Sequence, residues 1–195
     1  MAPEEIDLPL EDLVLRRWEP DDAPRALAAV EASLPELRRF MPWAMETPTL
    51  ATVGAFLEMA WRPPESFGFG LWEPDGQVVG AAGLHGRRGP GILEIGYWVR
   101  SDRTGRGYAT AAAGALTNVS FEHFAGVDRV EIRCDPANAA SAAVAAKLGY
   151  RLDRREDVDI EAEGQTGVQL VWAVSRATWR PSAGRPARPE ARTRR

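Results

Sequence analysis

One segment, residues 92–124, most limits the folds that this chain can adopt. Ile92 to Val99 has the apolar residues of a buried strand, and Ala109 to Phe124 has the alanine-rich composition of a helix. Between them lies Arg103-Thr104-Gly105-Arg106-Gly107, a Gly-x-Gly turn with two arginines. A strand that enters a helix through such a turn directs unpaired backbone N–H groups and the positive end of the helix dipole at one place. The segment therefore predicts an anion site, for which pyrophosphate is the natural ligand.

The sequence around this segment predicts a sheet flanked by helices. Strands are expected at Leu13–Trp18, Phe67–Trp72, Val78–Leu84, Arg129–Cys134, Tyr150–Asp159 and Gln169–Ser175, and helices at Ala23–Ala32, Pro35–Met41, Leu50–Trp61 and Asn138–Leu148. Three consecutive strands joined by short turns and then a βαβ crossover give the order β-α-α-β-β-β-α-β-α-β-β. We therefore predict an α/β (α+β) fold with a mixed, mostly antiparallel sheet of six to seven strands.

Composition favours a single domain without metal or disulfides. A chain of 195 residues with 45% hydrophobic residues can bury one core. One cysteine, Cys134, excludes a disulfide framework, and only two histidines, His85 and His123, argue against a multi-histidine metal site. Because isolated histidines at a strand end and a helix end are usually structural or exposed, neither is given a role. No apolar run reaches the ~20 residues of a membrane span, and the acidic N-terminus is unlike a signal peptide. We expect a cytoplasmic protein with no membrane partner.

Charge separates the body of the chain from its end. Residues 176–195 hold seven arginines and one glutamate together with three prolines, whereas residues 1–175 are acidic overall. We expect a single domain at 1–175 and a disordered basic tail at 176–195. An acidic body does not suit a protein that grips phosphate backbones, so nucleic acid is expected only through the tail. It suits a cationic or amine-bearing substrate better.

Three specific interpretations of the glycine turn can be compared with its sequence. A dinucleotide fingerprint needs a third Gly or Ala where this chain has Thr110, and it belongs to the first βα turn of a parallel sheet. A Walker loop needs Gly-Lys-Ser/Thr, but the only lysine is Lys147. A glycine-rich turn without any ligand is the third.

Two motifs together resemble the GNAT superfamily of acyl-CoA-dependent N-acyltransferases. The first is the strand, turn and helix described above, and the second is Asp135-Pro136-Ala137-Asn138-Ala139-Ala140-Ser141 with its continuation to Tyr150. The branch of ribosomal-protein N-terminal alanine and serine acetyltransferases is the most similar, and Leu37–Ala44 also resembles its second-helix region. The resemblance covers about residues 13–174. It implies a sheet splayed between strands 92–99 and 129–134, with acetyl-CoA as the acyl donor.

The resemblance also implies which residues bind that donor. Trp98, Val99 and Arg100 would lie along the pantetheine arm, and the Val99 N–H would stabilise the thioester oxyanion. Asn138 would contact the arm, or would simply cap its helix. Lys147 would reach a cofactor phosphate, or would be a solvated lysine. The pyrophosphate would lie on the backbone of Thr104, Gly105, Arg106, Gly107, Tyr108, Ala109 and Thr110.

The catalytic residues match the family less completely than the donor-binding residues do. The family often places a tyrosine acid seven residues after the asparagine, but this chain has Ala145 there. Ser141 would protonate or stabilise the leaving thiolate instead, unless it only bonds back to a helix carbonyl. Glu94 is the candidate general base, acting directly or through a water, with Glu131 and Asp135 as weaker alternatives.

Four further positions complete the expectations from the family. The family loop prefers Gln or Arg where this chain has Asp102, and it often has Arg where this chain has Thr104. Met41 and Trp43 are predicted to form a wall of the substrate pocket, because the region of the first two helices covers the acceptor side in the family.

These residues predict an N-acetyltransferase that transfers the acetyl group of acetyl-CoA to a primary amine by direct attack. The acceptor is left open between a protein N-terminal α-amine and a small amine such as an amino acid, polyamine or antibiotic. The alternative is a non-catalytic acyl-CoA-binding sensor or assembly subunit, which the absent tyrosine at Ala145 allows. A homodimer is a candidate assembly.

Overall fold

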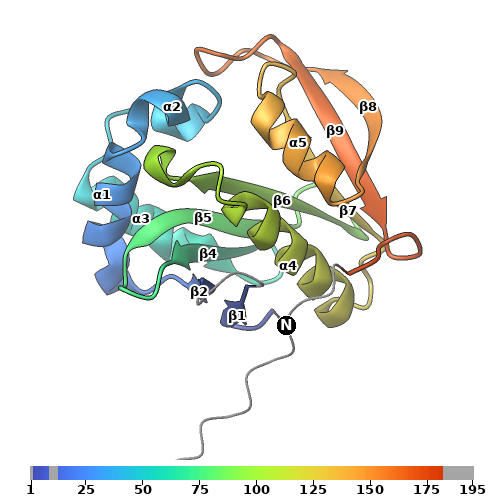
Figure 1. Ribbon diagram of the computed structural model, residues 1–195, viewed down its shortest axis with the longest axis horizontal. Helices are drawn as coiled ribbons and strands as arrows, with labels where there is room; N and C mark the ends of the chain where they lie inside the picture. Colours follow the sequence, from blue (N-terminus) through green and yellow to red (C-terminus); the bar gives the residue numbers. More distant parts are fainter. Residues whose placement is uncertain (1, 9–12, 182–195) are drawn as a thin grey trace, which may run out of the picture.

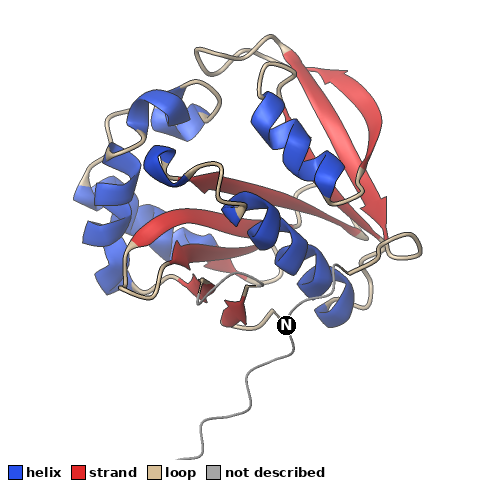
Figure 2. Cartoon of the chain, in the orientation of Figure 1, coloured by secondary structure: helices blue, strands red, loops and turns tan. Residues whose placement is uncertain are grey.

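A twisted sheet runs through the molecule, with helices on both of its faces (Figures 1 and 2). The computed structural model describes residues 2–8 and 13–181. The strand order is β1-β2-β4-β5-β6-β7-β9-β8, with β3 paired to β4 outside this path. Neighbouring strands are antiparallel except β6 and β7, which run parallel.

The described elements follow the predicted order, except that three helices and not two separate the first predicted strand from the next one. The strands are β1 (Glu5–Asp7), β2 (Val14–Arg17), β3 (Trp61–Arg62), β4 (Ser66–Trp72), β5 (Val78–His85), β6 (Ile92–Val99), β7 (Arg129–Cys134), β8 (Arg151–Asp157) and β9 (Val168–Ser175). The helices are α1 (Ala23–Glu31), α2 (Leu34–Arg38), α3 (Leu50–Ala60), α4 (Tyr108–His123) and α5 (Ala139–Lys147). Short 3₁₀ turns lie at Pro20–Asp22, Pro42–Ala44 and Ser101–Arg103.

The prediction of a mixed, mostly antiparallel sheet is confirmed, but the predicted number of six to seven strands is wrong, because the described sheet has nine. The additional strands, β1 and β3, have three and two residues. Such short strands cannot show a two-residue alternation, so periodicity does not reveal them. They extend the edge next to β2 and β4, away from β6 and β7.

The two faces of the sheet bury different cores. On one face, Leu84 and Ile95 pack with the small residues Ala112 and Ala113 and with Leu116 of α4. Because alanine has no side chain beyond Cβ, α4 can lie close to the sheet, which explains its composition. Residues of α1 and α3 cover the other face, where they pack against Ala81, with Trp98 beside them.

β6 and β7 separate halfway along their length. Their parallel pairing runs from Ile92 opposite Arg129 to Ile95 opposite Ile132 and then stops. β6 continues to Val99 while remaining paired to β5 on its other side. The predicted splay between these two strands is therefore confirmed, and it leaves one edge of Gly96–Val99 without a neighbouring strand. Figure 1 shows α5 and β9 on one side of this divergence and α2 on the other.

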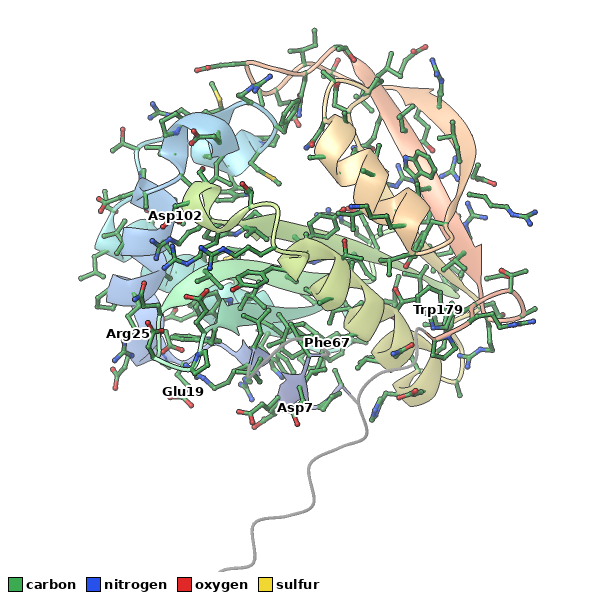
Figure 3. All side chains as sticks on the ribbon, viewed as in Figure 1. Asp7, Glu19, Arg25, Phe67, Asp102 and Trp179 are labelled. Carbon is green, nitrogen blue, oxygen red and sulfur yellow. The ribbon has the colours of Figure 1, made fainter. Side chains whose placement is uncertain are left out.

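The chain stays packed beyond residue 175, where we placed the start of a tail. Arg176 donates hydrogen bonds to the carbonyls of Phe124 and Val127, at 2.8 and 3.0 Å. The Trp179 indole is 7% exposed and lies near the carboxyl end of α4 (Figure 3). Residues 182–195 lie outside the described residues. No helix in the described part of the chain is long and apolar enough to cross a membrane.

Candidate functional site

The glycine loop before α4 presents unpaired backbone N–H groups. Gly105 and Gly107 have φ of +76° and +84°, in the left-handed region that glycine adopts without strain. Gly107 is the N-cap of α4, and its carbonyl accepts a hydrogen bond from the Ala111 N–H at 2.9 Å. A Cβ at either glycine would meet nothing within 4 Å, so the space beside the loop is open. The N–H groups of the first helical turn, which have no partner within the helix, belong to Tyr108, Ala109 and Thr110.

Glu73, from the β4–β5 turn, neutralises much of the side-chain charge at this loop. Its carboxylate lies 3.3 Å from the Arg103 guanidinium and 3.9 Å from that of Arg106, and it accepts a hydrogen bond from the Tyr108 hydroxyl at 2.7 Å. The Arg106 side chain remains half-exposed. The backbone, with Arg106 beside it, is therefore the main anion-binding feature of the loop.

The two positions that depart from the family loop both stabilise its conformation. Asp102 forms ion pairs with Arg100 and Arg103, at 2.8 and 2.6 Å. The Thr104 hydroxyl donates to the carbonyl of Ser101 at 3.0 Å. Arg100 thus turns back onto Asp102, and its guanidinium does not follow the free edge of β6.

The free edge of β6 offers backbone groups to the gap between the splayed strands. The Arg100 N–H donates at 2.8 Å to the carbonyl of Val79, which belongs to β5. Because backbone direction alternates along a strand, the N–H groups of Val99 and Tyr97 point away from β5, toward the gap. The same alternation places the side chain of Trp98 on the face covered by α1. Val99 therefore has its backbone N–H on the free edge, and its role as donor to the thioester carbonyl stays a prediction.

A pair of hydroxyl groups joins β6 to α5 beside this edge. The Tyr97 hydroxyl lies 3.0 Å from Ser141 Oγ and 3.3 Å from the Ser141 carbonyl. Burial raises the pKa of Tyr97 to about 12, so the phenol stays protonated at neutral pH. Asn138 caps α5 by accepting the Ser141 N–H at 3.1 Å. The Ser141 hydroxyl is thus oriented by Tyr97, which the sequence did not single out.

Three other residues of the second motif have clear surroundings. Ala145 is fully buried, and this position offers no phenol to act as the acid. Cys134 is buried, and burial raises the pKa of its thiol, which disfavours a thiolate nucleophile and agrees with direct transfer. Lys147 is exposed at the carboxyl end of α5 and makes no ion pair with any described residue. Its contact with a cofactor phosphate stays a prediction.

The predicted substrate wall lies on the opposite face of the sheet. Trp43 is 51% exposed, and its ring centroid is 6.3 Å from that of Trp98 on β6. Met41 and Trp98 both pack against the small cluster of Val30, Leu37 and Ala44. The structure therefore brings Met41, Trp43 and Trp98 together beside the outer half of β6.

The β8–β9 loop reaches across the gap to the segment after α2. The N–H of Gly164 donates to the Arg39 carbonyl at 2.8 Å, and that of Glu163 to the Arg38 carbonyl at 3.3 Å. Asp135, at the end of β7, accepts the Thr166 N–H at 2.7 Å and holds the base of this loop. Figure 1 shows the loop at the top of the molecule, next to α2. Asp135 therefore helps to hold this loop, and its role as an alternative base stays a prediction.

The predicted base Glu94 and its alternative Glu131 are held in an arginine cluster. Glu94 is 5% exposed, binds Arg87 and Arg88, and lies 3.8 Å from Arg133. Burial alone favours its neutral form, but the hydrogen bonds and charges of Arg87 and Arg88 outweigh burial and lower the pKa of Glu94. Glu131 is 1% exposed and its carboxylate contacts Arg129, Arg133 and Arg154, at 2.9, 2.9 and 3.2 Å. Both carboxylates already have cationic partners.

The fold and this arrangement define an acyltransferase with a splayed sheet and a glycine-loop anion site. The chain belongs to the GNAT acetyltransferase family, because the model described as "Acetyltransferase (GNAT) domain" matches residues 12–151. It is therefore an acetyltransferase, and acetyl-CoA is its acyl donor. The open glycine loop and the free edge of β6 fit such a donor, since they offer N–H groups to a pyrophosphate and to an extended arm.

The relatives of this chain agree with that assignment. It is 27% identical over 177 residues to YdaF of Bacillus subtilis (strain 168), which is named as a candidate ribosomal N-acetyltransferase, and the match covers 87% of this chain and 94% of YdaF. Among solved structures, Mycobacterium smegmatis RimJ in complex with CoA-disulfide is 26% identical, with a TM-score of 0.73 and coverage of 85% of this chain and 82% of RimJ. RimL, a ribosomal L7/L12 alpha-N-protein acetyltransferase in complex with coenzyme A, shares the fold at 18% identity, with a TM-score of 0.80 and coverage of 88% and 98%.

Proposed function

We propose that this protein acetylates a primary amine, and that a protein N-terminal α-amine is the favoured acceptor over a small amine. One observation carries the proposal: the Val99 N–H edge, the Tyr97–Ser141 hydroxyl pair and the glycine loop all border the gap where β6 leaves β7. The names of YdaF and RimL support an acceptor on a ribosomal protein.

The residues around the gap suit direct transfer from a thioester. The acyl donor supplies a carbonyl carbon activated by sulfur. The Val99 N–H is placed to stabilise the negative charge that develops on the carbonyl oxygen. The Ser141 hydroxyl, with the Tyr97 phenol behind it, is placed to give a proton to the departing sulfur. Burial raises the pKa of the Cys134 thiol, which disfavours an acyl-enzyme on this residue.

An α-amine also suits the acid–base demands of the site. Its ordinary pKa of about 8 leaves roughly a tenth of it neutral at pH 7, whereas a lysine amine is almost wholly protonated. Met41, Trp43 and Trp98 offer an apolar wall to the residues that follow the acceptor amine. The homodimer, the cytoplasmic location and a nucleic-acid contact through residues 176–195 stay predictions.

Calorimetric titration with acetyl-CoA, and with NADH as the control ligand, tests the donor site. We expect micromolar binding of acetyl-CoA and none of NADH. Gly107→Glu should abolish the binding, because it places a carboxylate beside the N-terminus of α4. Gly149→Glu is the matched control: its φ of +79° imposes the same backbone strain, and a Cβ there also meets nothing within 4 Å.

Thiol release with a panel of N-terminal peptides and polyamines then tests the transfer. Acetylated peptide supports the proposal, and acetylated polyamine alone replaces the α-amine with a small-molecule acceptor. Binding of acetyl-CoA without transfer to any amine would favour the sensor or assembly subunit instead. If Gly107→Glu binds as well as Gly149→Glu, the donor site has been misplaced.

A further inference from the structure

His85, which the sequence analysis left without a role, lies where the gap between β6 and β7 begins. It is the last residue of β5 and is paired with Glu94, next to the pair formed by Gly83 and Gly96. Within 4 Å, a Cβ at Gly96 would meet only the His85 ring, with Nε2 at 3.6 Å, and a Cβ at Gly83 would lie 3.4 Å from the same nitrogen. The imidazole therefore lies along this glycine pair. Gly96 is the first β6 residue beyond the last pair with β7.

The face on which the imidazole lies is the one with the proposed acceptor wall. Alternation along β5 and β6 places His85, Gly96 and Trp98 on the same face. Trp98 packs there beside Met41 and next to Trp43. Tyr97 and Ser141, the proposed proton donors to sulfur, lie on the opposite face. The gap thus has an imidazole on one face and a hydroxyl pair on the other.

Hydrogen bonds fix which nitrogen of the imidazole can accept a proton. The Ser66 hydroxyl donates to the Ala60 carbonyl at 3.2 Å, and this bond uses its only proton. His85 Nδ1 lies 3.3 Å from the same Ser66 oxygen, and we assign the ring hydrogen to Nδ1, which then donates to that oxygen. Nε2 is then the unprotonated nitrogen, and no described residue hydrogen-bonds to it.

The charges around His85 also favour the neutral ring. Burial is the main cause that lowers its pKa, and the positive charge of Arg87 adds to this, while Glu94 acts in the opposite direction. Glu94 in turn binds Arg88 of the same loop and lies 3.8 Å from Arg133 of β7, which also pairs with Glu131. β4 contributes only the Ser66 hydroxyl. A neutral imidazole can accept a proton at pH 7, whereas the paired Glu94 is a weak base.

We propose that His85 Nε2 is the general base of the transfer, an inference that rests on the proposed function. As the neutral amine forms its bond to the acyl carbon, the carbon–sulfur bond breaks. The proton that the nitrogen loses passes to His85 Nε2, and the departing sulfur takes one from Ser141. Water then takes the proton from His85 and restores that of Ser141. Ser66 is a positioning residue, because it fixes the Nδ1–H tautomer without touching the acceptor.

The pH dependence of kcat/KM for the acceptor tests this role. In the wild type, amine and imidazole must both be neutral, so the logarithm of kcat/KM should rise with a slope of 2 below both pKa values. His85→Gln should reduce the slope to 1 and lower kcat by about 10²-fold or more, the range of general-base catalysis, with the acetyl-CoA Kd unchanged. His123→Gln, at the exposed end of α4, is the matched control and should keep the slope of 2.

A second measurement does not depend on turnover. Nitrogen-15 NMR of the free protein, with His85 assigned from the His85→Gln spectrum, should show a protonated Nδ1 and an unprotonated Nε2. Ser66→Ala should mix the tautomers and lower kcat without moving the acetyl-CoA Kd. The opposite tautomer, or a slope of 2 in His85→Gln, overturns the assignment of His85 while leaving the acetyltransferase intact. A wild type that acetylates no amine would instead overturn the proposed function.

Discussion

At the scale of single residues, the contact between Tyr97 and Ser141 is the most testable feature of the gap. Tyr97 comes from β6 and Ser141 from the first turn of α5, and their oxygens are 3.0 Å apart. We expect Ser141→Ala to lower kcat by about 10²-fold, the lower end for loss of a general acid, and Tyr97→Phe to lower it less, because the serine hydroxyl remains. The Kd of acetyl-CoA, measured by titration, should stay within about twofold of the wild type, since neither hydroxyl forms the anion loop.

Tyr150→Phe provides a matched control for the loss of a buried phenol. The Tyr150 hydroxyl lies 2.7 Å from Thr117 Oγ1 in the core, so this variant also breaks a tyrosine–hydroxyl bond. Its cost should be about 1 kcal/mol in the free energy of unfolding, with kcat unchanged. Equal effects of Tyr97→Phe and Tyr150→Phe on kcat would mean that Tyr97 has only a structural role.

These residues also show how far sequence reasoning reaches. Ser141 could be named because it stands at a fixed spacing from Asn138 in a recognisable motif. Tyr97 lies 44 residues before its partner, and His85 lies 19 residues after Ser66. Local patterns hold no information on such pairs, because only the strand register and the helix packing bring them together. Glu94 was on the predicted strand, but the arginines that hold it come from a turn and from β7.

At the scale of elements, the β8–β9 loop contacts the segment after α2, which lies on the other side of the gap between β6 and β7. Gly164 is tightly packed: a Cβ there would lie 2.7 Å from the Arg39 carbonyl oxygen. Since that atom belongs to the backbone, Gly164→Ala must displace the loop from the segment after α2. We expect the acceptor KM to rise about tenfold in steady-state assays, as misplaced positioning groups commonly cause, with acetyl-CoA binding unchanged.

Gly126→Ala is the control for this element, because a Cβ at Gly126 meets nothing within 4 Å. It should leave the acceptor KM unchanged. If Gly164→Ala also leaves it unchanged, the loop does not border the acceptor site. A rise in acetyl-CoA Kd would instead assign the loop to the donor side.

The elements themselves were mostly predictable, and their contacts were not. The order from β2 to β9 follows from periodicity and turn residues, and the splay was predicted only through the family resemblance. The hydrogen bond between Gly164 and Arg39 joins segments more than 100 residues apart, and nothing in either segment's pattern indicates the other. Short strands such as β3 exist because β4 provides a partner, so tertiary context decides them.

At the scale of the whole molecule, the end of the packed chain differs from the compositional boundary. Arginines begin to dominate at Arg176, but Arg176 itself binds carbonyls at the end of α4 and in the α4–β7 loop. The Trp179 indole N–H donates to Asn118 Oδ1 at 2.8 Å, and its ring meets that of Tyr150 edge-on at 6.2 Å. Composition responds to charge, whereas the buried Trp179 keeps the described chain packed beyond Ser175.

Two truncations separate these boundaries. Ending the chain after residue 175 removes the buried Trp179 and should lower the free energy of unfolding by about 3–5 kcal/mol, the usual cost of deleting a core tryptophan. Ending it after residue 181 removes five arginines and one glutamate but no described contact, so the Tm and the acetyl-CoA Kd should match those of the full chain. Thermal unfolding and titration check both expectations. Retention on RNA at low salt then tests the tail alone: if the full chain and the 181-residue chain are retained equally, the arginines beyond residue 181 bind no nucleic acid.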